Sequence, residues 1–405
     1  MSADANIKTI AQAYEAFGRG DVAAILDMVT DDVDWAAEAA SDGAPWYGVR
    51  RGKDAVAAFF KQEGAKLKAK YAARSANGRV PTAHMLAISG GGDDGAFAAG
   101  LLVGWSAHGD RPKFDLVTGI SAGALTAPFA YLGKDYDRQL AGLFVNHGDE
   151  DIYQATVLEG LFGGISVADS APLARLIATY IDWRMLHRIG EERAKGRVLL
   201  VGTTNLDAQR PVYWDMGKIA LSKHPEALKL FRQVLLASAS LPGVFPPVHI
   251  RVSAGGQSYE EMHVDGGPTH QVIFTPAAFD FRDLDKVIGR KVDRHLWVIR
   301  NGKIAPEYDP VGDSALAIAE RSLETLTKSQ GIGDLLRMHA QARAEGVDFN
   351  LAHIPADFSA PRAAPFDQTY MRALYERGLL LGRAGYPWEN APPGVEASHA
   401  DTTAR

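Results

Sequence analysis

The sequence predicts an α/β fold: a three-layer α/β/α domain with a mainly parallel central sheet, preceded by a small α-rich appendage. Beyond about residue 80, short apolar runs alternate with segments of helical period, which favours strands joined by helices that cover both faces of one sheet. Ahead of that point, apolar residues recur at helical spacing instead. With 46% apolar and 23% charged residues, the chain has the composition of an ordinary globular protein.

The N-terminal appendage is predicted to span residues 1–65. Apolar residues from Ile7 to Phe17 follow a helical period, and the glycines within residues 18–20, with Asp21, end that helix and start the next. Helices are predicted over residues 7–17, 22–29 and 52–60, and a short strand over residues 30–35. A lysine-rich stretch followed by Ser, Asn and Gly predicts a linker over residues 66–80.

The larger domain is predicted to span residues 81–360. Its strands are expected over residues 85–88, 115–118, 198–201, 262–264 and 296–299. Its helices are expected after Gly95, after Ser121, and over residues 172–180, 230–239 and 315–344. Residues 361–405 then form a C-terminal extension, which we expect to end in a loose tail.

The first motif that could carry chemistry is Gly119-Ile120-Ser121-Ala122-Gly123, which fits G-x-S-x-G between a strand and a helix. A sharp turn here raises the serine hydroxyl to an exposed, strained apex, and the flanking glycines let neighbouring backbone pass close by. Free N–H groups at the start of the following helix favour negative charge that develops there. Ser121 is the candidate nucleophile; the alternative is a glycine-rich turn with an incidental serine.

A serine hydroxyl needs a base, and the run His263-Val264-Asp265-Gly266-Gly267 offers a carboxylate at a strand end. The two glycines would let the chain turn tightly toward the serine. A carboxylate can take the proton where the site is dry enough to raise its basicity, or where transfer is concerted with attack. Asp265 is the candidate base; the alternative is an ordinary Asp-Gly turn.

The third motif is a glycine-rich loop between a strand and a helix, Ser89-Gly90-Gly91-Gly92-Asp93-Asp94-Gly95. Successive backbone N–H groups in such a loop can converge on an oxyanion or a phosphate. Gly90, Gly92 and Gly95 also satisfy the dinucleotide-binding pattern G-x-G-x-x-G, whose acidic partner would be Asp110 or Asp115. Asp115, however, opens the strand that leads to the serine turn, which a cofactor domain does not require.

Taken in this order, the three motifs resemble the signature of the patatin-like phospholipases, and residues 237–247 resemble the family's segment ahead of the aspartate. The resemblance covers about residues 85–299. It implies a lipid acyl hydrolase without a cofactor, in which Ser121 is the nucleophile and Asp265 the base of a catalytic dyad. The backbone amides of Gly91, Gly92 and Asp93 would then form the oxyanion hole, and the reaction would pass through an acyl-enzyme.

The appendage carries a second resemblance. The run from Phe17 to Trp35, with Tyr47-Gly48 and the helix after Gly52, is similar to the opening half of the SnoaL-like (nuclear transport factor 2-like) fold. The strands that would close that fold are not predicted, because the pattern of the larger domain has begun by Met85. The appendage is therefore expected to be a partial SnoaL-like unit.

The glycine-rich loop departs from the family in one respect. Many members carry Arg or Lys there, whereas this chain has Asp93-Asp94. Carboxylates that faced the site would repel an anionic phosphate, while carboxylates at the helix start would cap the helix. Hydrolysis of esters or acyl lipids in general is therefore expected, rather than of phospholipids in particular.

Two other functional interpretations stay open. An α/β-hydrolase uses the same serine turn with a downstream acid and histidine, and four histidines follow Asp265: His270, His295, His339 and His353. Alternatively, the fold is a binding or regulatory module with vestigial hydrolase residues, which the presence of both Ser121 and Asp265 argues against. His263 would share a strand face with Asp265, but a buried structural histidine is the simpler interpretation.

Bulk properties narrow the partners. A net charge of −6 without long single-sign runs argues against nucleic acid. The chain has no cysteine, and no His, Asp and Glu cluster stands at ligand spacing, so we predict no metal and no cofactor. No apolar stretch of about 18 residues and no secretory signal occur, which predicts a cytoplasmic protein that meets a lipid or other acyl ester from the aqueous side, including at a membrane surface. The oligomeric state is not indicated.

Overall fold

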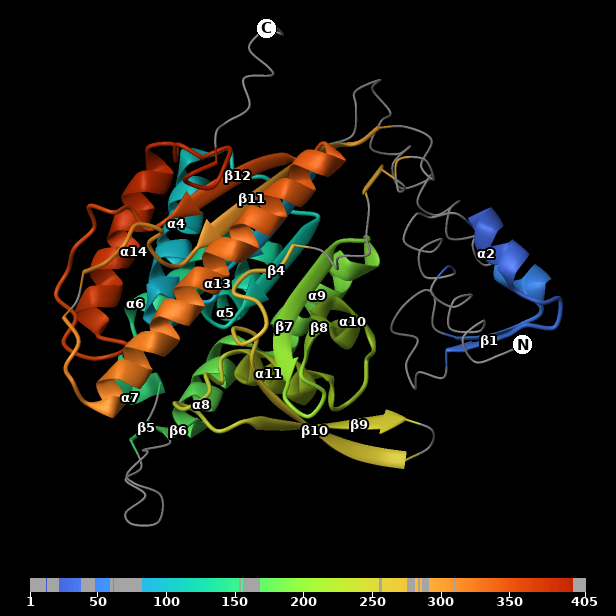
Figure 1. The fold of residues 1–405 in the computed structure, drawn as a ribbon, viewed down its shortest axis with the longest axis horizontal. Coiled ribbons are helices and arrows are strands. Elements are labelled where there is room, and N and C mark those ends of the chain that lie inside the picture. Colours follow the sequence, from blue (N-terminus) through green and yellow to red (C-terminus); the bar gives the residue numbers. More distant parts are fainter. Residues whose placement is uncertain are drawn as a thin grey trace, which may run out of the picture.

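The computed structural model has a mixed α/β architecture around one large sheet (Figure 1). It describes residues 22–37, 48–58, 82–152, 154–155, 168–254, 257–274, 291–308 and 310–395, together with residues 12, 61, 281, 282 and 285. The helix predicted over residues 7–17 (apart from residue 12), the linker over 66–80 and the tail from 396 lie outside these residues.

The large sheet of the described chain has eight strands, in the order β12-β11-β3-β4-β7-β10-β9, with β8 paired to β7. The parallel strands are β3 (Thr82–Ile88), β4 (Leu116–Ile120), β7 (Val198–Asn205), β11 (Asp293–Arg300) and β12 (Asp348–His353). The antiparallel strands are β8 (Arg210–Asp215), β9 (Val248–Ala254) and β10 (Gln257–Asp265). Every strand predicted for the larger domain lies in this sheet, whose parallel part continues into an antiparallel end.

Helices follow the strands at the predicted places. Those predicted are α4 (Gly95–His108), α5 (Ala122–Leu132), α8 (Ala171–Tyr180), α11 (Ala227–Ser238) and α13 (Ala315–Glu345). Those not predicted are α6 (Asp137–Val145), α7 (Asp149–Ile152), α9 (Trp183–Ala194), α10 (Met216–Leu221) and α14 (Gln368–Arg383), the short 3₁₀ turns η1 (Gly92–Asp94) and η2 (Lys134–Tyr136), and the hairpin of β5 (Gln154–Ala155) and β6 (Ala168–Asp169).

The period-two alternation of the strands gives the sheet two apolar faces. In β3, Leu86 and Ile88 belong to one hydrophobic core, while Met85 and Ala87 belong to another. The first core includes residues of α4, α5, α8, α9, α11 and α14, and the second includes Leu335 and its neighbours on α13. The sheet therefore lies between two helical layers, and α13 is the long helix that crosses it in Figure 1.

The last helix, α14, packs along α4. Gly100 and Gly104 of α4 face Gly378 and Gly382 of α14, and a Cβ on any of the four would collide with the backbone of the other helix. Glycines on both facing surfaces let the two helices approach closely, because the distance between helix axes depends on the side chains at the contact. Part of the predicted C-terminal extension thus belongs to the helical layer over the first core.

The described part of the appendage contains α2 (Val22–Met28), an antiparallel pair of β1 (Asp34–Ala37) with β2 (Gly48–Arg51), and helical residues 53–58. Its first strand begins later than predicted. Residues 30–33 form a turn in which the Val33 N–H donates to the Thr30 carbonyl at 3.1 Å. Asp31-Asp32 is a sequence that favours turns, and this local preference outweighs the apolar pattern.

Candidate active site

The glycine-rich loop and the serine turn leave the sheet side by side. β3 and β4 are parallel neighbours, and Ile88 at the end of β3 is level with Gly119 in β4. The chain then enters the loop after β3 and reaches Ser121 after β4. A Cβ added to Gly90 would lie 3.1 Å from the Cβ of Ser121, so the two motifs are in contact.

The third motif reaches the same edge from the opposite direction. β10 is antiparallel to β7. If the two strands paired over their whole lengths, the last residue of β10 would lie beside the first residue of β7, far from Ser121. However, β7 continues past the level of Ile120, which pairs with Gly202, and Asp265 pairs with the following residue, Thr203. The end of β10 therefore lies beside the turn that carries Ser121.

Ser121 occupies a strained backbone position. Its φ of 54° and ψ of −125° lie in a region that residues other than glycine rarely adopt. Gly119 and Gly123 make the turn sterically feasible, because a Cβ on Gly119 would collide with the Gly123 carbonyl, and one on Gly123 with the Ile88 carbonyl. The serine stands at the N-terminus of α5, where the helix dipole favours negative charge.

Asp265 is a buried carboxylate with a free oxygen. Its exposed fraction is 2%, and its Oδ1 accepts the Gly267 N–H at 2.7 Å, whereas Oδ2 has no hydrogen-bond partner among the described residues. Burial raises the pKa of Asp265 to about 6, and interactions with the Ser121 hydroxyl and the Gly267 N–H partly oppose that rise. The Ser121 hydroxyl thus lowers the pKa of Asp265, although Oδ2 accepts no hydrogen bond from it in this structure.

The peptide N–H groups of Gly91 and Gly92 are available as donors. Neither donates to another described residue. Gly92 has a φ of 59°, and a Cβ on Gly91 would collide with Asn301, so both positions need glycine. The N–H of Asp93, the third donor named from sequence, lies close to its own carboxylate instead.

The end of α11 and the residues that follow it connect the serine and the aspartate. The Ser238 hydroxyl accepts the Ser121 N–H at 3.0 Å and donates to the Gly202 carbonyl at 2.7 Å. Two residues later, the Ser240 carbonyl accepts the Asp265 N–H at 2.9 Å. Sequence reasoning named the segment 237–247 by resemblance but gave no role to Ser238, because nothing in the local pattern says where its hydroxyl points.

Gln271 ties the aspartate loop to the glycine-rich loop. Its side-chain amide donates to the Gly267 carbonyl at 3.2 Å, and its main-chain carbonyl accepts the Gly90 N–H at 3.0 Å. A Cβ on Gly267 would lie 2.8 Å from that side-chain amide, and one on Gly266 would lie 2.9 Å from the Gly202 carbonyl. Gly266 is thus needed for close packing against backbone, whereas the contact at Gly267 is with the end of a flexible side chain.

The carboxylates of Asp93 and Asp94 do not cap α4, since neither makes a side-chain hydrogen bond at a helix start. Asp93 instead pairs with Arg362, 2.9 Å from the arginine Nε, and Asp94 accepts the Tyr370 hydroxyl at 2.6 Å. Burial raises the pKa of both carboxyls, that of Asp94 to about 6. The capping interpretation is therefore wrong, because distant partners in the C-terminal segment hold both side chains.

The downstream histidines lie elsewhere among the described residues. The ring of His270 contacts Tyr213, His295 stacks on His84, His339 packs on Phe349, and His353 pairs with Glu389. His263 is fully buried, with Nδ1 3.0 Å from the Thr203 hydroxyl and Nε2 3.1 Å from Glu261. These contacts give His263 the structural setting that sequence analysis favoured.

A narrow cavity of about 50 Å³ opens beside Ser121 and Gly92. Its lining is mostly apolar and includes residues of α5, α6 and α8 and of the loop after α11: Leu125, Leu143, Phe144, Leu173, Leu176 and Phe245. No histidine is among the described residues that line it. The volume holds a few water molecules, so a longer acyl chain requires these side chains to move apart.

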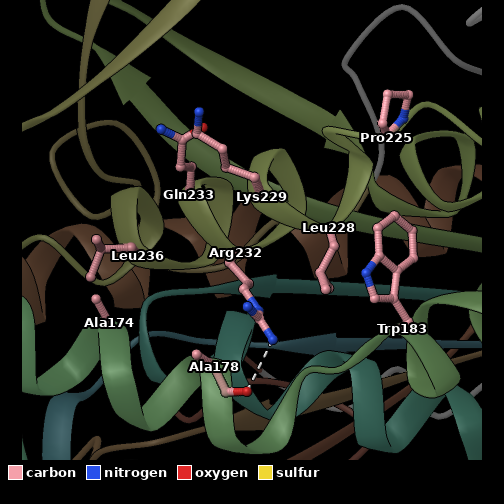
Figure 2. Close-up of a pocket in the computed structure, with 9 residues that line it drawn as sticks. All are labelled: Ala174, Ala178, Trp183, Pro225, Leu228, Lys229, Arg232, Gln233 and Leu236. Carbon is pink, nitrogen blue, oxygen red and sulfur yellow. Dashed lines mark hydrogen bonds between the residues drawn. The ribbon is translucent and has the colours of Figure 1, made fainter.

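A wider groove of about 430 Å³ lies between α8 and α11 (Figure 2). None of the motif residues lines it. Its central cation, Arg232, donates to the Ala178 and Ile181 carbonyls at the end of α8, and Trp183 borders it. Despite its size, no serine, carboxylate or histidine is among the described residues that line the groove.

Comparison with known families agrees with this site. Residues 86–278 match the model described as patatin-like phospholipase, and residues 10–95 match that of the SnoaL-like domain. The patatin-like match covers just under half of the chain. The patatin-like match spans all three motifs and supports a lipid hydrolase, since this family acts on lipid esters. The two matches share residues 86–95, which in the structure are the end of β3, the glycine-rich loop and the first residue of α4.

Among solved structures, VipD from Legionella pneumophila aligns with 75% of this chain and 67% of its own, at 12% sequence identity and a TM-score of 0.38. No curated protein matches the chain. Within the part of the chain that the structure describes, no group of His, Cys, Asp and Glu is arranged to hold a metal ion. No helix there is long and apolar enough to cross a bilayer.

Proposed function

We propose that the patatin-like domain is a serine acyl hydrolase in which Ser121 is the nucleophile, Asp265 the base, and Gly91 and Gly92 the oxyanion donors. The observation that carries this proposal is the pairing of a serine at φ 54° with a buried carboxylate oxygen that has no other partner. The strained backbone of Ser121 and the unpartnered oxygen of Asp265 each lower the stability of the fold, and a turn with a purely structural role requires neither. Such groups concentrate at catalytic sites.

In the first half-reaction, the Ser121 Oγ attacks the ester carbonyl carbon while its proton passes to Asp265 Oδ2. The carbonyl oxygen becomes an oxyanion, which the N–H groups of Gly91 and Gly92 stabilise; one such donor is typically worth ~10²–10³ in rate. The carbon–oxygen bond of the ester then breaks, and the leaving alkoxide takes the proton from Asp265. The acyl-enzyme remains on Ser121.

In the second half-reaction, Asp265 takes a proton from water as the water oxygen attacks the acyl carbon. The oxyanion forms again at the two glycine amides and collapses with cleavage of the bond to Ser121. The proton held by Asp265 returns to the serine Oγ, and the free acid leaves. A pKa of about 6 suits this role, because the carboxylate is ionised at neutral pH yet more basic than a solvent-exposed aspartate.

The substrate class follows from the apolar cavity. An acyl chain fits a lining of leucine and phenylalanine, and the ester bond would lie at the polar end, where Ser121 and Gly92 border the cavity. The cation of Arg362 pairs with Asp93, which reduces the repulsion between the glycine-rich loop and an anionic phosphate. The proposed substrates are acyl esters, lipid esters included, with a membrane surface as one source.

For the domain organisation, we propose an N-terminal SnoaL-like appendage over residues 1–65 and a linker over 66–80. The hydrolase domain would begin at about residue 81 and continue through α14, whose glycines pack on α4. This boundary places residues 361–383 within the hydrolase rather than in a separate extension.

The test is hydrolysis of p-nitrophenyl esters of increasing acyl length by the full chain and by Ser121→Ala and Asp265→Asn. We expect turnover to be abolished by the first change and to drop by at least ~10²-fold in the second. Ser222→Ala, an exposed serine at the end of α10, is the matched control and should keep full activity. A wild type that hydrolyses no ester and no phospholipid would instead favour a binding module.

A further inference from the structure

The C-terminal segment 362–371 contacts the glycine-rich loop through side chains and backbone. It lies beyond residues 86–278, which match the patatin-like model. The guanidinium of Arg362 makes two contacts with the Asp93 carboxylate, Nε to Oδ2 at 2.9 Å and Nη2 to Oδ1 at 3.0 Å. The Phe366 N–H donates to the same Oδ2 at 3.0 Å. Asp93 is only 3% exposed, so its charge depends on these partners rather than on water.

The neighbouring carboxylate is held by the same segment. The Tyr370 hydroxyl donates to Asp94 Oδ1 at 2.6 Å, and the Arg362 guanidinium lies 5.6 Å from the centre of the Tyr370 ring. Arg362 and Tyr370 therefore contact each other as well as the loop. The two consecutive residues that directly follow Gly91 and Gly92 are thus held by the same C-terminal segment.

The segment is itself rigidly placed. Asp367 caps α14 by accepting the N–H groups of Thr369 at 2.8 Å and Tyr370 at 3.0 Å. Phe366 has a φ of 61°, an unfavourable value for a bulky residue, and its ring lies 3.9 Å from the position of a Cβ on Gly92. Phe366 and Met371 also line the cavity beside Ser121.

We propose that Arg362 and Tyr370 are positioning residues that latch the glycine-rich loop through Asp93 and Asp94, so that the Gly91 and Gly92 amides face the reacting carbonyl. This inference rests on the proposed function of that loop as oxyanion hole. Without Arg362, the buried Asp93 carboxylate would be left with too few partners and would turn toward water. The adjacent glycine amides would move with it, and the oxyanion would lose its donors.

The experiment compares Arg362→Gln and Arg362→Lys with Arg377→Gln in the full chain. Arg377, in α14, is the matched control, because it too is an arginine of the C-terminal part of the chain that forms an ion pair, but its partner is the exposed Asp357, at 2.7 Å, and not a residue of the loop. We expect Arg362→Gln to lower kcat on a short p-nitrophenyl ester by about tenfold or more, with KM nearly unchanged, because the donors act mainly on the transition state. Arg362→Lys should restore part of kcat, and Arg377→Gln should retain all of it.

A double-mutant cycle separates positioning from general stability. If Arg362 acts through Asp93, then Arg362→Gln should change kcat by less than about twofold in an Asp93→Asn background. Tyr370→Phe, which removes only a hydroxyl, serves if the arginine variants do not fold, and it should lower kcat several-fold. Equal kcat for the wild type and a folded Arg362→Gln, or for the wild type and Tyr370→Phe, would overturn the latch.

Labelling of the serine by a fluorophosphonate tests the proposed function separately from the proposed role of Arg362. A wild type that is labelled at Ser121 while Arg362→Gln is labelled just as fast contradicts the latch alone. A wild type that is not labelled at all contradicts the proposed function, and the latch with it. Slower labelling of Arg362→Gln than of Arg377→Gln supports both.

Discussion

The buried carboxylate of Asp265 should lower the free energy of unfolding, compared with an uncharged side chain at the same position. Asp265 is 2% exposed, and folding raises its pKa from 3.8 to about 6. Since each pKa unit corresponds to about 1.4 kcal/mol, keeping this carboxylate ionised at pH 8 lowers the free energy of unfolding by about 3 kcal/mol. Asp265→Asn should therefore abolish most activity and yet stabilise the protein.

The stabilisation by Asp265→Asn should be largest at high pH and should decrease as the pH falls. The folded-state pKa lies above the unfolded value, so the penalty is complete above about pH 6 and shrinks as the folded carboxyl takes up a proton. It vanishes below about pH 3.8. The asparagine keeps an oxygen for the Gly267 N–H, and its amide can donate to Ser121, so few contacts are lost.

The assay is urea unfolding of wild type and Asp265→Asn at pH 8, 6 and 4, with Asp357→Asn as control. The control residue forms an exposed ion pair with Arg377 and should change the free energy of unfolding by less than about 1 kcal/mol. An Asp265→Asn protein that is less stable than wild type at pH 8 would refute the reasoning. So would a gain that stays constant between pH 8 and pH 4.

Three further predictions follow from the same contacts. The kcat/KM for a neutral ester should fall below pH 7 with a midpoint near the Asp265 pKa of about 6, because the protonated acid cannot accept a proton; a profile that stays flat to pH 4 contradicts this. Ser238→Ala should lower kcat several-fold in ester hydrolysis, since it leaves the Ser121 N–H without its acceptor at a cost of about 1 kcal/mol; an unchanged kcat contradicts this role of Ser238. Gly100→Ala should destabilise the fold by about 1–3 kcal/mol in urea unfolding, because its methyl would collide with the Tyr375 carbonyl of α14; an unchanged midpoint contradicts the close helix contact.

Local patterns were enough to predict the main elements of the larger domain. The strands that end at Ile88 and Ile120 are apolar runs, and the glycines that follow them are needed for turns that only small residues allow. Ser121 and the glycine-rich loop come together because both follow parallel neighbouring strands. Their proximity could therefore be anticipated from the fold class alone.

The position of Asp265 could not be derived in this way. It depends on an antiparallel pairing and on the extension of β7 beyond β4, and neither leaves a signal in the sequence around the aspartate. The local pattern offered Asp265 as a candidate base, and the resemblance to a known family implied that it pairs with Ser121. No role could be predicted for Ser238, because its hydroxyl contacts a residue 117 positions away in the sequence.

The partners of Asp93 and Asp94 were beyond sequence reasoning for the same physical reason. Arg362 and Tyr370 follow them by 269 and 276 positions, and nothing within a turn or helix records a contact of that range. The four-residue spacing of Gly378 and Gly382 is visible in the sequence and could have indicated a close helix contact. That signal would have placed α14 inside the domain.

Mapping the site of covalent labelling by a fluorophosphonate tests most directly whether Ser121 is a nucleophile activated by Asp265. We predict one adduct per chain, on Ser121, with labelling at least ~10²-fold slower in Asp265→Asn. An adduct on a different residue, or an enzyme that hydrolyses esters while Ser121 remains unlabelled, would contradict it.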